Sequence, residues 1–108
     1  MQEDQKDRRA APRFAMRLPA HARFSNGSVQ EEETFTQDVS AKGAFFYVDS
    51  EIGGRRQVEL TLVLPAEGET PVDIRVRYSG RVARLERSPE GKVGVAAAFG
   101  SCEYLDPV

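Results

Sequence analysis

Apolar and polar residues alternate one by one along most of this chain, and this pattern constrains the fold more than any other feature. In the clearest run every second residue is apolar: Val58, Leu60, Leu62 and Leu64. A period of two is typical of a β-strand with one buried face, because successive side chains of a strand point to opposite sides. No segment of useful length shows the helical period, so the sequence predicts an all-β protein.

Such runs recur between clusters of turn-forming residues. The predicted strands are six, at residues 14–24, 33–39, 44–48, 58–64, 72–85 and 92–99. We expect the first to be interrupted at Pro19 and the acidic residues 31–33 to form a solvated loop. In the fifth run the apolar positions shift by one residue near Gly80 to Arg84, which indicates a bulge or a bend in this strand. Short strands at close intervals are typical of a small antiparallel barrel or sandwich.

The length of 108 residues suits one domain with one core and excludes a multi-domain enzyme. A domain of this size leaves no room for a deep enclosed cavity, so its ligands should bind at the surface. We expect residues 1–13 to form a flexible tail, residues 14–100 the barrel, and residues 101–108 a C-terminal tail with at most one helical turn.

The charge balance argues against a nucleic-acid partner. Lys and Arg number 15 against 17 Asp and Glu, a net charge of −2, so any site for an anion must be local. No stretch approaches the roughly 18–20 apolar residues of a membrane span, and the charged N-terminus does not resemble a secretion signal. One cysteine and one histidine cannot supply a closed zinc site, and the sequence predicts a cytoplasmic protein without a metal.

A basic patch precedes and overlaps the first predicted strand. No acidic residue interrupts its five arginines: Arg8, Arg9, Arg13, Arg17 and Arg23. A guanidinium group binds phosphate oxygens and the guanine O6/N7 edge in a bidentate manner, and it also stacks on bases. The alternative is a solvated basic face without a ligand.

The turn between the second and third predicted strands contains a second group of useful side chains. In the sequence Asp38-Val39-Ser40-Ala41-Lys42-Gly43, the carboxylate can accept hydrogen bonds from guanine and the hydroxyl can donate to phosphate. Gly43 allows a close approach that a side chain would block. The alternative is ordinary turn chemistry, because turns use Asp, Ser and Gly in any case.

Together the two groups form the order R-x-x-x-R, at Arg9 and Arg13, followed by D-x-S-x-x-G, at residues 38–43. R-x-x-x-R occurs elsewhere in the chain, whereas D-x-S-x-x-G occurs once. From Arg8 to about Phe99 the sequence resembles the PilZ domain family, receptors for the bacterial second messenger cyclic di-GMP. This resemblance implies a six-stranded antiparallel β-barrel.

The resemblance also implies a role for each motif residue. Arg9 and Arg13 would grip the phosphates and the Hoogsteen edge of a guanine, while Asp38, Ser40 and Gly43 would hold the ligand from the barrel. The N-terminal segment would then close over the ligand like a clasp.

Arg8 looks like the variant of the family that binds an intercalated cyclic di-GMP dimer. The predicted function is a bacterial, cytoplasmic receptor that is not an enzyme, uses no cofactor and signals through an unknown protein effector. Two alternatives stay open. One is a PilZ-fold adaptor that binds proteins and no nucleotide, and the other is a small nucleic-acid-binding barrel, which the net negative charge disfavours.

Overall fold

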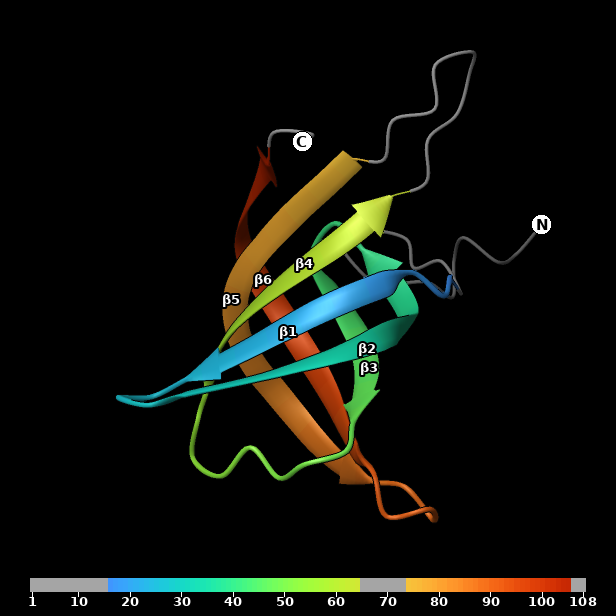
Figure 1. Ribbon diagram of the computed structural model, residues 1–108, viewed down its shortest axis with the longest axis vertical. Helices are drawn as coiled ribbons and strands as arrows, with labels where there is room; N and C mark the ends of the chain where they lie inside the picture. The colour runs from blue at the N-terminus through green and yellow to red at the C-terminus, as the bar shows by residue number, and fades with distance from the viewer. Residues whose placement is uncertain (1–15, 65–73, 106–108) are drawn as a thin grey trace, which may run out of the picture.

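The computed structural model describes residues 16–64 and 74–105, which form six antiparallel strands and no helix (Figure 1). The strands are β1 (Pro19–Ser25), β2 (Val29–Ser40), β3 (Gly43–Val48), β4 (Gln57–Leu64), β5 (Ile74–Arg87) and β6 (Val93–Leu105). The predicted all-β fold is confirmed. The expected flexible tail, residues 1–13, lies outside the described residues.

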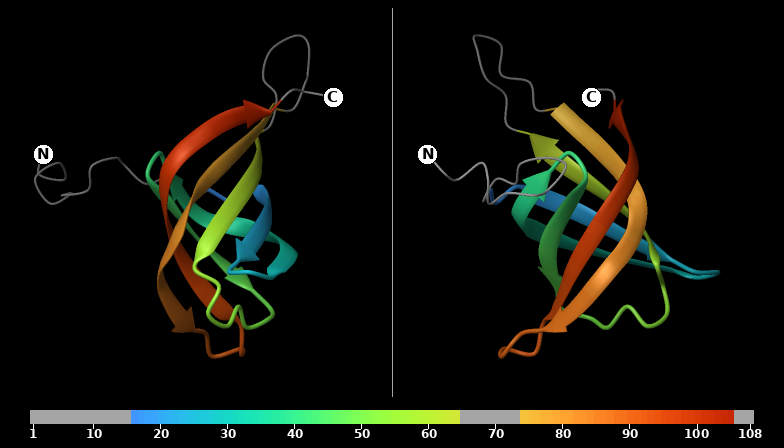
Figure 2. Two further views of the ribbon diagram at one scale, coloured as in Figure 1. Left: turned by 90° about the vertical axis from the view of Figure 1, so that its left-hand side faces the viewer. Right: turned by 180° about the vertical axis from the view of Figure 1, so that it is seen from behind.

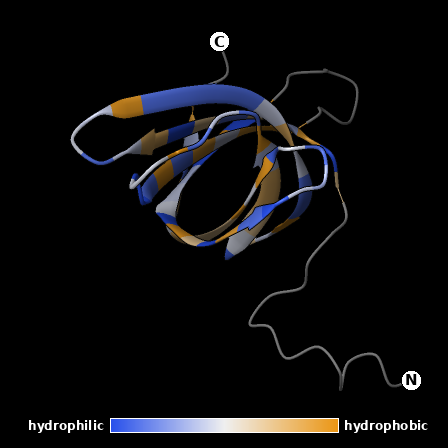
Figure 3. Ribbon diagram, turned by 90° about the horizontal axis from the view of Figure 1, so that it is seen from below, coloured by the Kyte–Doolittle hydropathy of each residue, from blue (hydrophilic) through white to orange (hydrophobic). Residues whose placement is uncertain are grey.

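The sheet closes on itself. The strands are ordered β1-β2-β3-β6-β5-β4, and β4 pairs with β1 again to complete the barrel. Seen from below, the ribbons form a ring (Figure 3), and β5 and β6 are the longest strands in the side views (Figure 2). Inward side chains fill the ring, with Phe24, Phe46 and Leu60 fully buried at its centre. A small barrel of this kind is a packed core, and its ligands bind outside it.

The acidic residues 31–33 are strand, not the loop that the sequence predicted. They lie in β2 and pair with residues 21–23 of β1. His21 stands opposite Glu33 and Arg23 opposite Glu31, so each acidic side chain on this face has a cationic or protonatable neighbour. Cross-strand pairs of opposite charge stabilise a sheet, and they allow a charged run to be the outer face of a hairpin.

The ends of the first and last strands also differ from the prediction. Residues 16–18 precede β1, which begins only at Pro19. The barrel does not end at residue 100, because β6 continues to Leu105 and pairs with β5 along this length. The expected C-terminal tail is therefore strand through residue 105, held in part by an ion pair of 3.2 Å between Arg77 and Glu103.

The predicted bulge in the fifth strand is confirmed. The register between β5 and β6 shifts at Ser79/Gly80 and again at Val82/Arg84. At the first shift the two backbones approach so closely that a Cβ on Gly80 would lie 1.9 Å from the carbonyl oxygen of Ala98. Only glycine fits there, and the extra residue at this shift is Gly100 of β6. The second shift leaves Ala83 of β5 without a counterpart in β6, and this bulge bends β5 so that the barrel can close.

One buried hydroxyl fixes the point where the chain enters the barrel. Thr36, fully buried in β2, donates from Oγ1 to the carbonyl oxygen of Met16 over 2.6 Å. Thr36 Oγ1 also accepts a hydrogen bond of 2.9 Å from the backbone N–H of Leu18. The backbone N–H of Thr36 donates in turn to the Leu18 carbonyl oxygen. The segment before β1 is thus attached to β2 close to Asp38.

We predict that Thr36→Val lowers the free energy of unfolding by about 1–3 kcal/mol, because it leaves two backbone groups without their partner. Denaturant unfolding measures this loss. Thr61→Val on the outer face of β4 is the matched control and should change stability by less than about 0.5 kcal/mol. Equal effects of the two substitutions would contradict the role given to Thr36.

Candidate functional site

A bulge in β2 determines the direction of Asp38. Thr36 stands opposite Phe46, and both are fully buried in the barrel. Asp38 stands opposite Phe45, so Gln37 is an extra residue without a counterpart in β3. An extra residue reverses the alternation of side chains. Asp38 therefore lies on the outer face, where regular alternation would have buried its carboxylate.

The Ser40 side chain holds the turn that follows Asp38. The Oγ of Ser40 accepts a hydrogen bond of 3.2 Å from the backbone N–H of Lys42 and donates over 3.4 Å to the carbonyl oxygen of Gly43. Only 8% of the Ser40 surface is exposed. The hydroxyl thus shapes the turn, which is the alternative that the sequence analysis left open beside its role as a donor to phosphate.

Gly43 is required by close packing. A Cβ at this position would lie 2.6 Å from the carbonyl oxygen of Ala97 in β6. Beside it the Phe99 N–H donates to the carbonyl oxygen of Lys42 over 2.9 Å, which ties the turn to β6. Gly43 does not adopt a positive φ, so the reason for glycine is the short distance between the strands and not a left-handed conformation.

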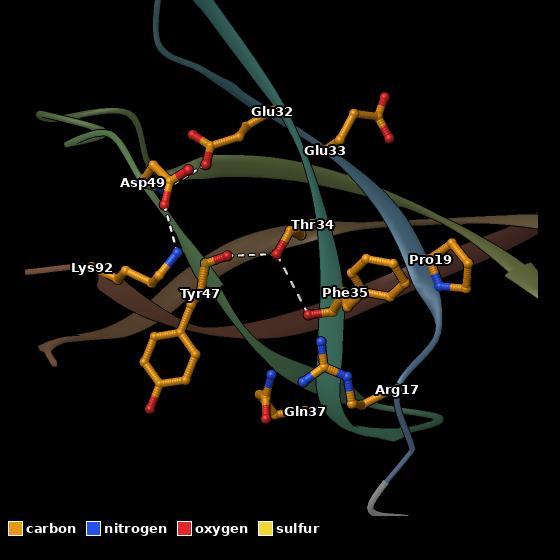
Figure 4. A pocket seen from close by; sticks show the side chains of 10 residues that line it. All are labelled: Arg17, Pro19, Glu32, Glu33, Thr34, Phe35, Gln37, Tyr47, Asp49 and Lys92. Atoms are coloured by element: carbon orange, nitrogen blue, oxygen red, sulfur yellow. Dashed lines mark hydrogen bonds and ion pairs between the residues drawn. The ribbon is translucent and has the colours of Figure 1, made fainter. Parts of the chain in front are cut away.

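A groove of about 500 Å³ lies next to Gln37, the bulge residue of β2 (Figure 4). Its lining comes from the segment that enters β1, from β2 and β3, and from the loops that follow β3 and β5: Arg17, Pro19, Glu32, Glu33, Thr34, Phe35, Gln37, Tyr47, Asp49 and Lys92. The guanidinium carbon of Arg17 lies 5.3 Å from the centre of the Phe35 ring, which is 47% exposed. Gln37, the bulge residue next to Asp38, lies at the same end of the groove as Arg17.

The two ends of the groove differ in charge. At one end Lys92 forms an ion pair of 2.8 Å with Asp49, and the Glu32 carboxylate accepts hydrogen bonds from the backbone N–H groups of Asp49 and Ser50. At the other end Arg17 forms no ion pair within the described ranges, and its guanidinium group makes a cation–π contact with the Phe35 ring. A negatively charged, planar ligand therefore finds its complement at the end next to Asp38.

Three of the six predicted site residues lie together in this one turn: Asp38, Ser40 and Gly43. The other three, Arg8, Arg9 and Arg13, lie outside the described residues, so their part in a site stays a prediction. The sequence did not single out Gln37 or Phe35. The spacing of Thr36 and Val39 could have revealed the bulge, because two inward residues three apart break the period of two.

His21 lies between two carboxylates on the neighbouring strand. Its Nδ1 is 2.6 Å from Glu33 Oε2, and its Nε2 is 2.6 Å from Glu31 Oε1. Both ring nitrogens can donate only in the imidazolium form. The hydrogen bonds to Glu33 and Glu31 raise the pKa of His21 above its ordinary value of 6.5.

The family model of the PilZ domain matches residues 7–103, and the chain belongs to the PilZ domain family, a family of cyclic di-GMP receptors. The structure of the Bacillus subtilis inhibitor of motility (MotI/DgrA) has a similar fold, with a TM-score of 0.69 at 18% sequence identity. The match covers 88% of this chain and 44% of that one. A comparison with curated proteins gave no match. No helix among the described residues could cross a membrane.

We predict that Gly43→Ala destabilises the domain by about 1–3 kcal/mol, because the added methyl group forces β3 and β6 apart. Thermal unfolding measures the effect. Gly54→Ala is the matched control: its Cβ would meet only the Asn26 side-chain nitrogen, at 3.8 Å, and should be tolerated. A Gly43→Ala variant as stable as Gly54→Ala would contradict the close approach described here.

His21 provides a prediction about pH. It is the single histidine of the chain, so NMR titration of its ring protons reports one pKa without ambiguity. We expect a value above 6.5 that falls in a Glu31→Gln, Glu33→Gln double variant. Because the folded-state pKa is raised, the stabilising contribution is fully present below pH 6.5 and is lost as the pH rises through the folded value. A folded-state pKa at or below 6.5 would contradict the two hydrogen bonds.

Proposed function

We propose that this domain is a non-enzymatic receptor for cyclic di-GMP that holds the dinucleotide between Arg9 and Arg13 on one side and the turn from Asp38 to Gly43 on the other. The observation that carries the proposal is the bulge at Gln37, which places Asp38 on the outer face while Gln37 itself lines a groove that also holds the stack of Arg17 on Phe35. Membership of the PilZ family supports the same ligand.

The covalent chain allows the two motifs to meet. The carbonyl oxygen of Met16 accepts a hydrogen bond from Thr36, which is two residues before Asp38 in β2. Arg13 is three residues before Met16 in the sequence, and three residues of extended chain span at most about 10 Å. This length allows Arg13 and Asp38 to contact one ligand of nucleotide size.

The chemistry of the two sides is complementary to a guanine nucleotide. A carboxylate such as that of Asp38 accepts from the N1–H and the amino group of guanine, and arginines bind O6, N7 and phosphate oxygens. Charge-assisted hydrogen bonds contribute about 1.5–3 kcal/mol each. Four or five of them, less the cost of ordering the N-terminal segment, give about −8 kcal/mol, which corresponds to a micromolar Kd.

Arg8 belongs to the proposal as the residue that would favour two intercalated ligands over one. The groove next to Gln37 supports this stoichiometry, because the Arg17 guanidinium, stacked on the Phe35 ring, offers a planar surface on which a second guanine could stack. Signalling through a protein effector, in a bacterial cytoplasm, completes the proposed function.

A PilZ-fold adaptor that binds no nucleotide is the second candidate. The hydrogen bonds of Ser40 favour it, because they complete the turn without a ligand. Membership of the PilZ family, a family of cyclic di-GMP receptors, favours the receptor.

Calorimetric titration of cyclic di-GMP into the full chain tests the proposal. We expect a micromolar Kd that weakens with added salt, and a loss of at least about tenfold in both the Arg9→Ala, Arg13→Ala double variant and Asp38→Ala. A stoichiometry near two ligands per chain is the result expected from Arg8.

The matched control uses the second R-x-x-x-R spacing of the chain, at Arg77 and Arg81 of β5. Arg77→Ala, Arg81→Ala removes the same charge from another strand and should leave the affinity unchanged, apart from a small general salt effect. GTP should give no heat. Absence of binding to the wild-type chain would contradict the receptor and leave the adaptor as the function to pursue.

A further inference from the structure

The upper part of β6 has an edge that no described strand covers. β3 pairs with β6 from Val93 to Ala98, and a last hydrogen bond joins Lys42 to Phe99. Beyond this point residues 101–105 pair with β5 alone, and Gly100 is the extra residue of β6 at the register shift between Ser79 and Gly80. Both views in Figure 2 show β6 rising past the end of β3. Such an edge presents unpaired backbone donors and acceptors, and proteins usually cover it or pair it.

The side chains at this edge are more apolar than a solvated strand requires. Tyr104 is 75% exposed, more than any other large apolar residue among the described ones, and Cys102 is exposed as well. Cys102 stands opposite Tyr78 and Tyr104 opposite Val76, so both lie on the face that continues the barrel interior. Farther along the edge Gly100 has open space, because a Cβ there would meet no atom within 4 Å.

We propose that this edge pairs with the same edge of a second copy of the chain, antiparallel and centred on Cys102. A twofold axis perpendicular to the sheet would pair Cys102 with Cys102, Ser101 with Glu103, and Gly100 with Tyr104, and would join the two barrels through one continuous sheet. The inference does not depend on nucleotide binding.

Two constraints select this register over the neighbouring ones: the repulsion of like charges and the strand pairs that β6 already forms with β3. Centring the pair on Glu103 would place two carboxylates directly opposite each other, which destabilises a sheet. Centring it on Ser101 would bring Tyr104 opposite Ala98, whose edge is already paired with Gly43. The register on Cys102 uses residues 100–104 of each copy and opposes no like charges.

A tyrosine opposite a glycine already stabilises this barrel at another place. Tyr47 of β3 pairs with Gly94 of β6, and Tyr47 Cε1 lies 3.1 Å from where a Gly94 Cβ would be. An aromatic ring that covers a cross-strand glycine compensates for the missing side chain. The proposed pair places Tyr104 over the open Gly100 of the second copy, twice by symmetry. A second copy therefore matches this edge in backbone, charge and shape.

Sedimentation velocity over a range of protein concentrations tests the proposal. We expect the wild-type chain to form a dimer, Cys102→Ser to keep it, and Cys102→Lys to abolish it, because two lysines would face each other across the axis. Tyr104→Ala should raise the dimer dissociation constant at least about tenfold. Val29→Lys is the control, because Val29 is an exposed apolar residue of β2 outside the proposed interface. This substitution should leave the dimer unchanged.

Oxidation with diamide gives an independent readout. Opposed residues of an antiparallel pair have Cα atoms about 4.5–5.5 Å apart, within the range of a disulfide. Diamide takes two electrons and two protons as the two thiols become one S–S bond, so the wild-type chain should yield a covalent dimer and Tyr104→Ala much less of it. Circular dichroism confirms that each variant is folded. A wild-type chain that is monomeric up to about 1 mM, or a dimer that survives Cys102→Lys, would overturn the proposal.

Discussion

The extra residue in β2 is the constraint on which the candidate site depends. Inward side chains must alternate with outward ones along a barrel strand, and Thr36 has to point inward to hold the segment before β1. Without Gln37, the same alternation would turn Asp38 into the core, where an unpaired carboxylate is costly. The bulge satisfies both demands: the buried hydroxyl anchors the entering chain, and the carboxylate lies on the outer face next to Gln37, which lines the groove.

The turn next to this bulge is shaped before any ligand arrives. Ser40 closes it from within, and the short distance between Gly43 and Ala97 holds it against β6. A turn that is held in this way loses little entropy when a ligand binds. The motif residues thus divide into two kinds. Ser40 and Gly43 build the turn, and Asp38 is the group that it presents.

The sequence predicted the six strands well because most carry the period of two and the third is a short apolar run, and the shift of the apolar positions after Val82 correctly located the bulge in β5. The prediction failed where a partner on another strand decides the outcome. The acidic residues of β2 are strand because His21 and Arg23 face them, and residues 101–105 are strand because β5 pairs with them. The motif located Asp38 in the chain, but its direction depended on the pairing of Thr36 with Phe46, which sequence spacing alone only suggests.

The central claim is that cyclic di-GMP binds where the β2 bulge presents Asp38. Titration of the ligand into the ¹⁵N-labelled chain, followed by amide chemical shifts, tests this most directly. The account predicts that the largest changes fall on residues 37–45 and on Arg17, with little change on the outer face of β4 and β5. Shifts concentrated on β4 and β5, or none at saturating ligand, would contradict it.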